Sequence, residues 1–248
     1  MVGNMTDGSP DSVTRVLDAP NWLVDDATAD LAPEYHKAFR ALVENIWNVS
    51  ENELEPKIRE LVAVVVLAYR GYPTVGEHLR RALDAGASFR ELIEALQTVS
   101  VPAGFPAFHY ALADLRQLQE KLGDKASEAE ELQSDPSATH SSSAWSWLVE
   151  NYPEIEESKA RFLSLLWTPT NPVLSVKYRE VLASVILACR AYPTIDDHLR
   201  RAVREGATVN ELVEAMQTAA IVGGSACLHF ALPNLVRIQE ELEAGTFV

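Results

Sequence analysis

The stretch "RGYPTVGEHLRRALDAGAS" at residues 70–88 returns as "RAYPTIDDHLRRAVREGAT" at residues 190–208, which is 120 positions later. The offset stays constant along the chain, so residues 57–122 align with residues 177–242 without a gap. About half of the aligned positions are identical, which is typical of an internal duplication. The sequence therefore predicts two homologous domains, at residues 20–122 and 145–248.

Two segments lie outside the predicted repeats. Residues 1–19 have no basic start and no apolar run, so they are not expected to be a secretory signal and are predicted to be flexible. Residues 123–144, "GDKASEAEELQSDPSATHSSSA", are acidic and rich in serine, with no apolar period. This composition is typical of a linker between domains.

Composition and charge narrow the classes of partner. The chain has 248 residues, of which 47% are hydrophobic and 23% are charged, as expected for a globular protein with a full core. Its formal net charge of −15 repels phosphate backbones and anionic lipids, so neither nucleic acid nor a membrane is an expected partner. No apolar run reaches the roughly 20 residues that span a bilayer, and the expected location is the cytoplasm.

The repeats are predicted to be helical throughout, which places the chain in the all-α class. Residues 56–70, "PKIRELVAVVVLAYR", are apolar on nearly every side after their first turn, as in a helix buried within a bundle. The valines would also suit a strand, but the length and the proline start favour a helix. Pro73 ends this helix, Gly86 ends the next one, and Gly104 separates the last two helices.

Serine or threonine followed three residues later by an acid predicts a capping box, in which the hydroxyl accepts a hydrogen bond from a free amide at a helix start. The pattern occurs at Thr74–Glu77, Thr194–Asp197, Ser88–Glu91 and Thr208–Glu211. These boxes explain much of the repeated stretch as signals that mark where helices begin.

Signals for helix starts and ends do not explain a glutamate and a histidine that both repeats share. Glu60 and Glu180 lie one turn into the apolar helix, and His78 and His198 lie in the first turn of the next. A histidine and a carboxylate at one cleft can transfer protons, with the imidazole as the general acid or base. The alternatives are a first-turn acid that complements the helix dipole and a histidine that is hydrogen-bonded within the bundle.

Two adjacent arginines follow each histidine, Arg80 and Arg81 in one repeat and Arg200 and Arg201 in the other. Adjacent side chains point about 100° apart around a helix, so at most one of each pair can lie next to the histidine. That arginine could hold a substrate carboxylate through two hydrogen bonds. An ion pair with a neighbouring glutamate is the alternative.

The remaining histidines and the cysteines give no sign of a metal site. His109 and His229 follow the glycine break and are expected to pack near the site or contact the substrate. Cys189 and Cys227 are expected to be free thiols. The sequence has no HExxH pair, no P-loop, no GxGxxG and no GxSxG, so we expect no metal and no cofactor.

The pattern "KxRELxxxxxxxxRxYPTxxxHLRRAxxxGAxxxELxEAxQT", followed by a glycine break, resembles the carboxymuconolactone decarboxylase family, which includes the AhpD-like proteins. The resemblance covers residues 34–122 and 154–242. It implies two all-helical bundles in tandem that form a built-in dimer. It also implies a homo-oligomer, with a trimer of tandem chains favoured.

The peroxidase branch of this family carries Cys-x-x-Cys about a dozen residues after the glutamate. Those positions hold Tyr72 and Val75 in the first repeat and Tyr192 and Ile195 in the second, so the dithiol is missing. His78 also lies one residue closer than the branch spacing. A thiol peroxidase is therefore disfavoured, since its chemistry needs two neighbouring sulfur atoms.

The branch without cysteines, which the chain resembles better, removes a carboxylate from a small unsaturated lactone acid without a cofactor. By resemblance, the predicted function is a lyase in which the histidine and glutamate of a repeat transfer the proton and an arginine holds the substrate. Tyr72 or Tyr192 could donate a hydrogen bond to the developing oxyanion. The alternatives are an isomerase or cyclase of the same fold on a larger hydrophobic substrate, and a non-catalytic oligomeric binding protein.

The two sites are expected to be unequal, because a fused copy can specialise or decay. The second copy has Ser225-Ala226 where the first has Phe105-Pro106, and Asp196 where the first has Gly76.

Overall fold

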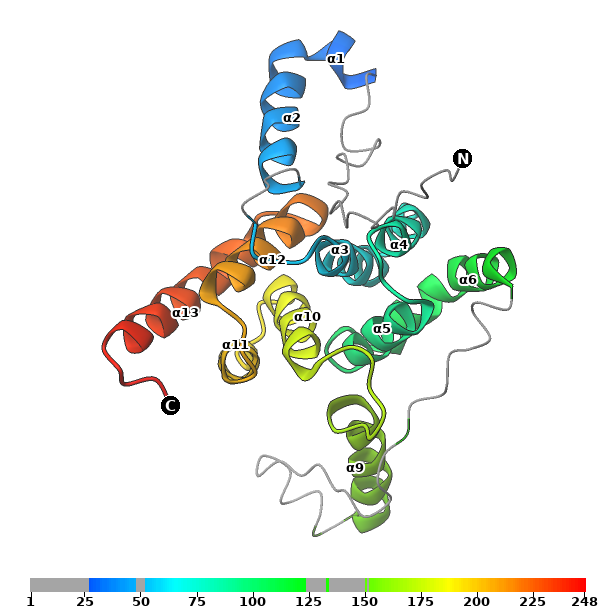
Figure 1. Ribbon diagram of the computed structural model, residues 1–248, viewed down its shortest axis with the longest axis vertical. Coiled ribbons are helices and arrows are strands. Elements are labelled where there is room, and N and C mark those ends of the chain that lie inside the picture. Colours follow the sequence, from blue (N-terminus) through cyan, green and yellow to red (C-terminus); the bar gives the residue numbers. More distant parts are fainter. Residues whose placement is uncertain (1–26, 48–51, 124–132, 134–149, 151) are drawn as a thin grey trace, which may run out of the picture.

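The computed structural model describes residues 27–47, 52–123, 133, 150 and 152–248. The predicted flexible segment and nearly all of the predicted linker lie outside these residues. The first repeat contains α1 (Ala27–Leu31), α2 (Pro33–Trp47), α3 (Pro56–Arg70), α4 (Val75–Asp84), α5 (Phe89–Ala103) and α6 (Phe105–Leu122). The second contains α9 (Pro153–Trp167), α10 (Val176–Cys189), α11 (Ile195–Arg204), α12 (Val209–Gly223) and α13 (Ala226–Glu243). The all-α class is confirmed, since none of the described residues forms a strand (Figure 1).

The local signals set most of the helix boundaries. α3 begins at Pro56, whose missing amide hydrogen costs nothing at a helix start, and is followed by Gly71 in the left-handed conformation with φ 69°. The capping boxes at Ser88 and Thr208 are confirmed, since both hydroxyls accept a hydrogen bond from the amide three residues on.

The capping boxes predicted at Thr74 and Thr194 are wrong. Both residues do precede a helix, but neither side chain makes a capping hydrogen bond. The backbone of Thr74 has φ −77° and ψ 1°, and that of Thr194 has φ −72° and ψ 5°. A capping side chain needs an extended backbone at this position, because only then does its oxygen reach the third amide of the helix.

The two repeats interlock around one hydrophobic core. α3 and α10 lie at the centre of the molecule, and the outer helices surround them (Figure 1). α12 packs against α3, and α5 packs against α10, so each repeat covers the central helix of the other. The buried apolar side chains of both repeats form a single continuous cluster.

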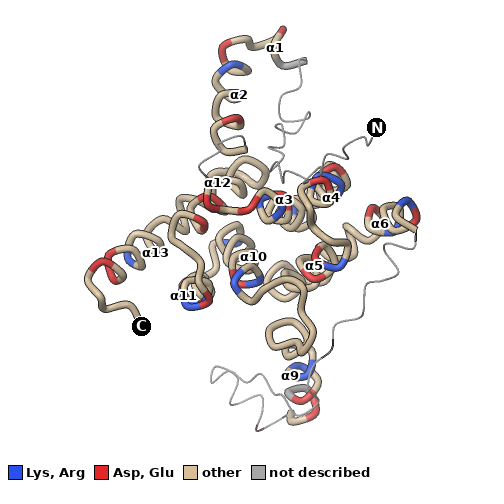
Figure 2. Tube along the Cα trace, viewed as in Figure 1, with Lys and Arg blue, Asp and Glu red and all other residues tan. Residues whose placement is uncertain are grey.

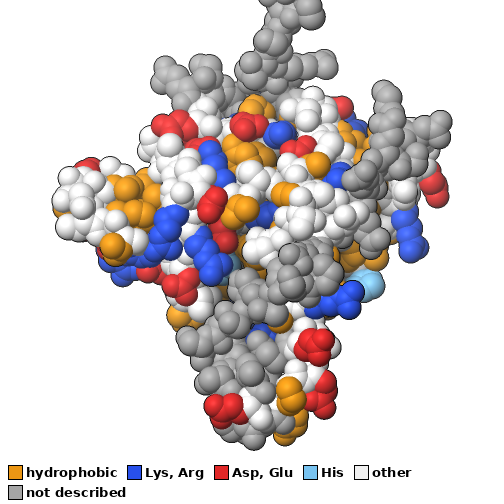
Figure 3. All heavy atoms as spheres, turned by 60° about the horizontal axis from the view of Figure 1, so that its bottom comes forward, with side chains coloured by type: hydrophobic (Ala, Val, Ile, Leu, Met, Phe, Trp, Pro, Cys, Tyr) orange, Lys and Arg blue, Asp and Glu red, His pale blue; other side chains and the backbone are white. Residues whose placement is uncertain are grey.

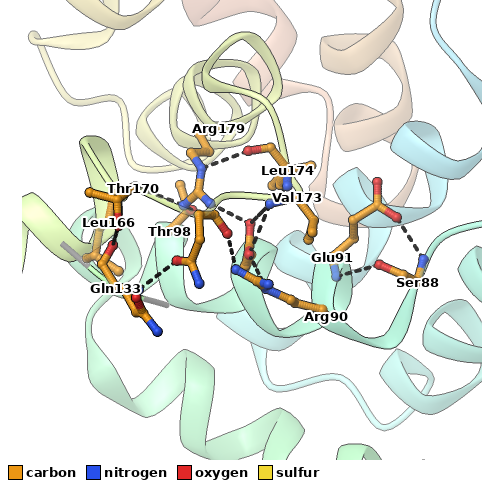
Figure 4. Close-up of polar contacts among 12 residues, drawn as sticks. Ser88, Arg90, Glu91, Thr98, Gln133, Leu166, Thr170, Val173, Leu174 and Arg179 are labelled. Atoms are coloured by element: carbon orange, nitrogen blue, oxygen red, sulfur yellow. Dashed lines mark hydrogen bonds and ion pairs between the residues drawn. The ribbon is translucent and has the colours of Figure 1, made fainter. Parts of the chain in front are cut away.

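An ion pair between Arg179 of the second repeat and Glu94 of the first links the two repeats. The Arg179 guanidinium is fully buried and donates to the Glu94 carboxylate, to Leu174 O at 3.0 Å and to Leu166 O at 2.9 Å. Figure 4 shows Arg179 at the centre of this network, with Thr98 beside it. Removing one partner of such a buried ion pair costs much more stability than removing one partner of an exposed pair.

The duplication repeats this contact more loosely on the other side. Arg59 and Glu214 stand 120 positions from Arg179 and Glu94 and lie 3.8 Å apart. Glu214 also accepts hydrogen bonds from the amides of Glu53 and Leu54. The two cross-repeat pairs therefore share a design but differ in how closely they are made.

The outer helices carry charges of both signs. Figure 2 shows acidic and basic residues side by side on α4, α6 and α11, rather than on separate faces. Within the described part of the chain, no helix has both the length and the apolar character needed to cross a membrane.

Candidate functional site

The second repeat brings a glutamate and a histidine together at the contact between α10 and α11. The Nδ1 atom of His198 lies 2.6 Å from Oε2 of Glu180, within hydrogen-bond distance. The indole ring of Trp167, from α9, lies 5.4 Å from the imidazole, measured between ring centroids. Since Nδ1 faces the carboxylate, Nε2 is the nitrogen that can exchange a proton with a bound molecule.

His198 lines a cavity of about 440 Å³. Its walls come from both repeats, because the C-terminal end of α5 contributes Val101 and Pro102 to it. Arg190 extends across this boundary and donates to the carbonyl oxygen of Pro102. The volume is within the range of small-molecule sites, and the second repeat cannot form this cavity without the first.

Positive side chains dominate the charge of this cavity. Among the described residues, Lys159, Arg190 and Arg201 line it, against one carboxylate from Asp197. Figure 3 shows basic side chains next to acidic ones on the face of the molecule that is turned forward. A chain with an overall charge of −15 thus presents a cationic cavity, as suits an anionic ligand.

The equivalent glutamate–histidine pair of the first repeat, Glu60 and His78, is buried. His78 Nδ1 lies 2.7 Å from Glu60 Oε2, and the imidazole is fully buried. The Arg81 guanidinium donates twice to Glu60 Oε1, at 3.1 and 2.9 Å, and Trp47 Nε1 donates to the same oxygen at 2.9 Å. The carboxylate is saturated with donors from the protein itself.

The arginine marks the difference between the two sites. The side chain of Arg81 is 10% exposed and lies 2.9 Å from the Glu60 carboxylate. The side chain of Arg201 is 46% exposed and lies 3.5 Å from the Glu180 carboxylate. The expectation of unequal sites therefore agrees with the geometry. The second repeat has the accessible arrangement.

Burial and ion pairing act in opposite directions on Glu60. Burial raises the pKa of the carboxyl, but the hydrogen bond from His78 and the charges of His78 and Arg81 outweigh it. The pKa of Glu60 therefore lies below its ordinary value of 4.5. The carboxylate is the form that the fold stabilises.

We expect Glu60 to make the chain sensitive to acid. A carboxyl whose pKa is lowered by folding stabilises the fold above its unfolded pKa and loses that contribution as the pH falls through its folded pKa. The difference in unfolding free energy between wild type and Glu60→Gln should thus be largest at neutral pH and shrink below about pH 4.5. Urea unfolding at a series of pH values measures this difference.

The matched control is Glu120→Gln, on an exposed position of α6, which should leave the free energy of unfolding within about 0.5 kcal/mol of wild type at every pH. A Glu60→Gln deficit that stays constant from neutral to acid pH would contradict this prediction.

Arg80 and Arg200 do not reach the candidate site, which corrects the expectation that they hold the substrate. Arg80 pairs with Asp84 at 3.0 Å on the exposed side of α4. Arg200 pairs with Asp196 at 3.0 Å and with Glu241 at 2.6 Å. The rotation of one helical position turns both arginines away from their histidines.

His109 and His229 are also placed away from the site, contrary to the prediction that they contact substrate or pack beside it. Both are exposed, and neither lines the cavity at His198. The related tyrosines differ from each other: Tyr192 lines the cavity, whereas Tyr72 is half exposed and makes no contact with the His198 cavity.

Three residues of the site were not singled out by sequence. Trp167 ends α9 and Lys159 lies two turns earlier, so both line the cavity from the helix that packs on the other repeat. Arg190 belongs to the repeated Arg-x-Tyr-Pro motif, and its recurrence at Arg70 was the signal that could have identified it.

The two thiols meet each other, but not at this site. Cys189 and Cys227 are free, and neither lines the cavity at His198. Their mutual hydrogen bond, together with burial, raises the pKa of the Cys189 thiol above its ordinary value. Among the described residues, no group of three or more His, Cys, Asp and Glu side chains could hold a metal ion.

Comparison with known proteins agrees with this architecture. The chain is similar to the 1.70 Å crystal structure of a proposed gamma-carboxymuconolactone decarboxylase subunit from Burkholderia xenovorans LB400, with a TM-score of 0.57 and 26% identity over 90% of this chain and 92% of that one. No curated protein matches the chain. The carboxymuconolactone decarboxylase family matches residues 33–117 and 153–233, once in each repeat. The chain therefore belongs to the carboxymuconolactone decarboxylase family, of which it carries two copies in tandem.

Proposed function

We propose that the chain is a cofactor-free lyase that removes a carboxylate from a small unsaturated carbonyl or lactone acid in the cavity of the second repeat. One observation carries this proposal: the His198–Glu180 pair opens onto a cavity with a positive lining. The family, and the name of the related Burkholderia protein, support the same class of reaction.

Arg201 and its neighbours would hold the substrate. A guanidinium binds a carboxylate through two parallel hydrogen bonds, and Arg190 and Lys159 add positive charge from other walls. The apolar part of the lining, which includes Leu163 and Trp167, would contact the carbon skeleton. This division orients the substrate with respect to the imidazole.

The chemical step needs no electron acceptor outside the substrate. The bond to the departing carboxylate breaks, carbon dioxide leaves, and the electron pair passes into the conjugated carbonyl to give an enolate. Nε2–H of the protonated His198 then delivers a proton to carbon, and the ring takes up another proton from solvent. Glu180 beside Nδ1 offsets the positive charge on the ring and fixes its orientation.

Incubation with a panel of small unsaturated lactone acids and keto acids tests this function. We expect at least one to release carbon dioxide in equal amount to the product formed, with uptake of one proton per turnover. Binding of the acids without any release of carbon dioxide would instead favour the non-catalytic binding protein. An isomerised product of equal mass would favour the isomerase.

Arg201→Ala should raise KM for the acid substrate about tenfold or more, because a lost charge-assisted hydrogen bond costs about 1.5–3 kcal/mol. The matched control is Arg200→Ala, since the neighbouring arginine pairs with Asp196 and Glu241 outside the cavity. Steady-state kinetics with both variants measure the difference. Equal KM values in the two variants would exclude Arg201 from substrate binding.

A further inference from the structure

A second cavity lies on the other side of α9. It has a volume of about 160 Å³ and is enclosed by α5, α6 and α9. α9 contributes Phe162, Leu165 and Leu166 to it, whereas Lys159 and Leu163 face the cavity at His198. The two cavities share a helix but no chemistry, since none of the described residues that line the smaller one carries a charge.

Three phenylalanine rings, together with Leu165 and Leu166, form the apolar part of the smaller cavity. Phe105 and Phe108 come from α6, and Phe162 comes from α9. The rings of Phe105 and Phe162 stack at 5.6 Å between centroids, with 25° between their planes. Phe105 is 56% exposed, so a ligand would replace solvent on this ring.

A polar end faces these rings. Oε1 of Gln97 is buried, and no group in the described part of the chain hydrogen-bonds to it. Ser100 is also buried, and its hydroxyl donates to the backbone oxygen of Gln97 at 2.6 Å, which leaves the Ser100 oxygen able to accept. A buried carbonyl oxygen without a partner costs about 1–3 kcal/mol, and a ligand donor would remove that cost.

The duplication provides an internal comparison for this site. The positions 120 residues away from the three phenylalanines hold Leu42, Ser225 and Leu228. Gln97 keeps its amide as Gln217, but the aromatic rings occur on one side of the molecule only. Packing of the common fold therefore does not require the three rings, which indicates a separate role for them.

The geometry points to a binding site for a small uncharged aromatic alcohol, of the phenol class, between α5, α6 and α9. Its ring lies against Phe105, Phe108 and Phe162, and its hydroxyl pairs with Gln97 and Ser100. A hydroxyl both donates and accepts, so it can satisfy both polar groups. An apolar cavity of about 150 Å³ holds a benzene-sized molecule, which matches the volume here. This site is independent of the lyase proposed above.

Titration of the full chain with 4-fluorophenol, followed by ¹⁹F NMR of the probe, tests the site. We expect saturable binding with a dissociation constant on the order of 0.1–1 mM, as suits a ligand of this size. Fluorobenzene lacks the hydroxyl and 4-fluorobenzoate carries a charge, so both should bind about tenfold more weakly. Phe105→Ser, which introduces the residue of the second repeat, should weaken 4-fluorophenol about tenfold or more.

Gln97→Leu keeps the volume of the side chain and removes its amide. It should weaken binding of 4-fluorophenol and leave binding of fluorobenzene unchanged or tighter, a reversal that general unfolding would not produce. His198→Ala is the matched control, because His198 lines the other cavity. We expect it to leave the dissociation constant of 4-fluorophenol unchanged. Absence of saturable binding, or binding lost in His198→Ala and kept in Phe105→Ser, would overturn the proposal.

Discussion

His198→Ala is expected to lower kcat/KM about 100-fold or more, whereas His78→Ala should leave it within about twofold of wild type. General acid or base catalysis by a positioned imidazole is worth roughly 10²–10⁴ in rate. Both histidines contact their glutamates at nearly the same distance, 2.6 and 2.7 Å. Only His198 lines the cavity of about 440 Å³, so only its loss removes a group that a substrate can touch.

The two variants should also differ in stability, in the opposite order. His78 is fully buried, and its removal leaves the Glu60 carboxylate without one of its donors. We expect a loss of about 1–3 kcal/mol for His78→Ala and a smaller loss for His198→Ala. Urea unfolding measured beside the kinetics separates a catalytic defect from a folding defect. Equal losses of activity in the two variants would show that both repeats carry a working site.

Glu94→Ala is expected to cost about 3–5 kcal/mol of stability, the largest effect of a single substitution considered for this chain. It leaves the Arg179 guanidinium fully buried without its carboxylate. It also removes the acceptor of the Val173 and Leu174 amides. Since total stabilities are about 5–15 kcal/mol, thermal unfolding should shift downward by roughly 10 °C.

Glu214→Ala is the matched control at the related position of the second repeat. Arg59 lies 3.8 Å from Glu214, so the ion pair that is lost is weaker and the cost should be smaller. Combining Glu94→Leu with Arg179→Met removes both buried charges and should recover part of the stability lost by Glu94→Ala alone. The interpretation fails if Glu214→Ala is the more damaging of the two single substitutions.

Sequence reasoning offered the pairing of Glu60 with His78 and of Glu180 with His198 as one of two interpretations, and the structure places both pairs within hydrogen-bond distance. Sequence reasoning could not identify Lys159, which reaches the cavity from another helix, α9. The sequence predicted only that at most one of the two adjacent arginines in each repeat lies next to the histidine. The structure selects Arg81 and Arg201.

Local chemistry is what the sequence determined by itself: the duplication, the all-α class, the helix from Pro56 to Arg70 and the caps at Ser88 and Thr208. Apart from the duplication, which appears on comparing residues 120 positions apart, these features depend on residues a few positions apart, so a single sequence contains them. The failed boxes at Thr74 and Thr194 mark the limit, since there the turn imposes a backbone that the residue types do not reveal.

Tertiary structure alone decided which repeat is open. The residues of the two glutamate–histidine clusters are the same, so the difference comes from what packs around them. In the first repeat Trp47 and Arg81 donate to Glu60 and fill the space, while in the second Trp167 lines a cavity completed by the end of α5. Contacts between residues far apart in the chain create that cavity, such as Arg190 with Pro102 at a separation of 88 positions, and no local pattern in the chain encodes them.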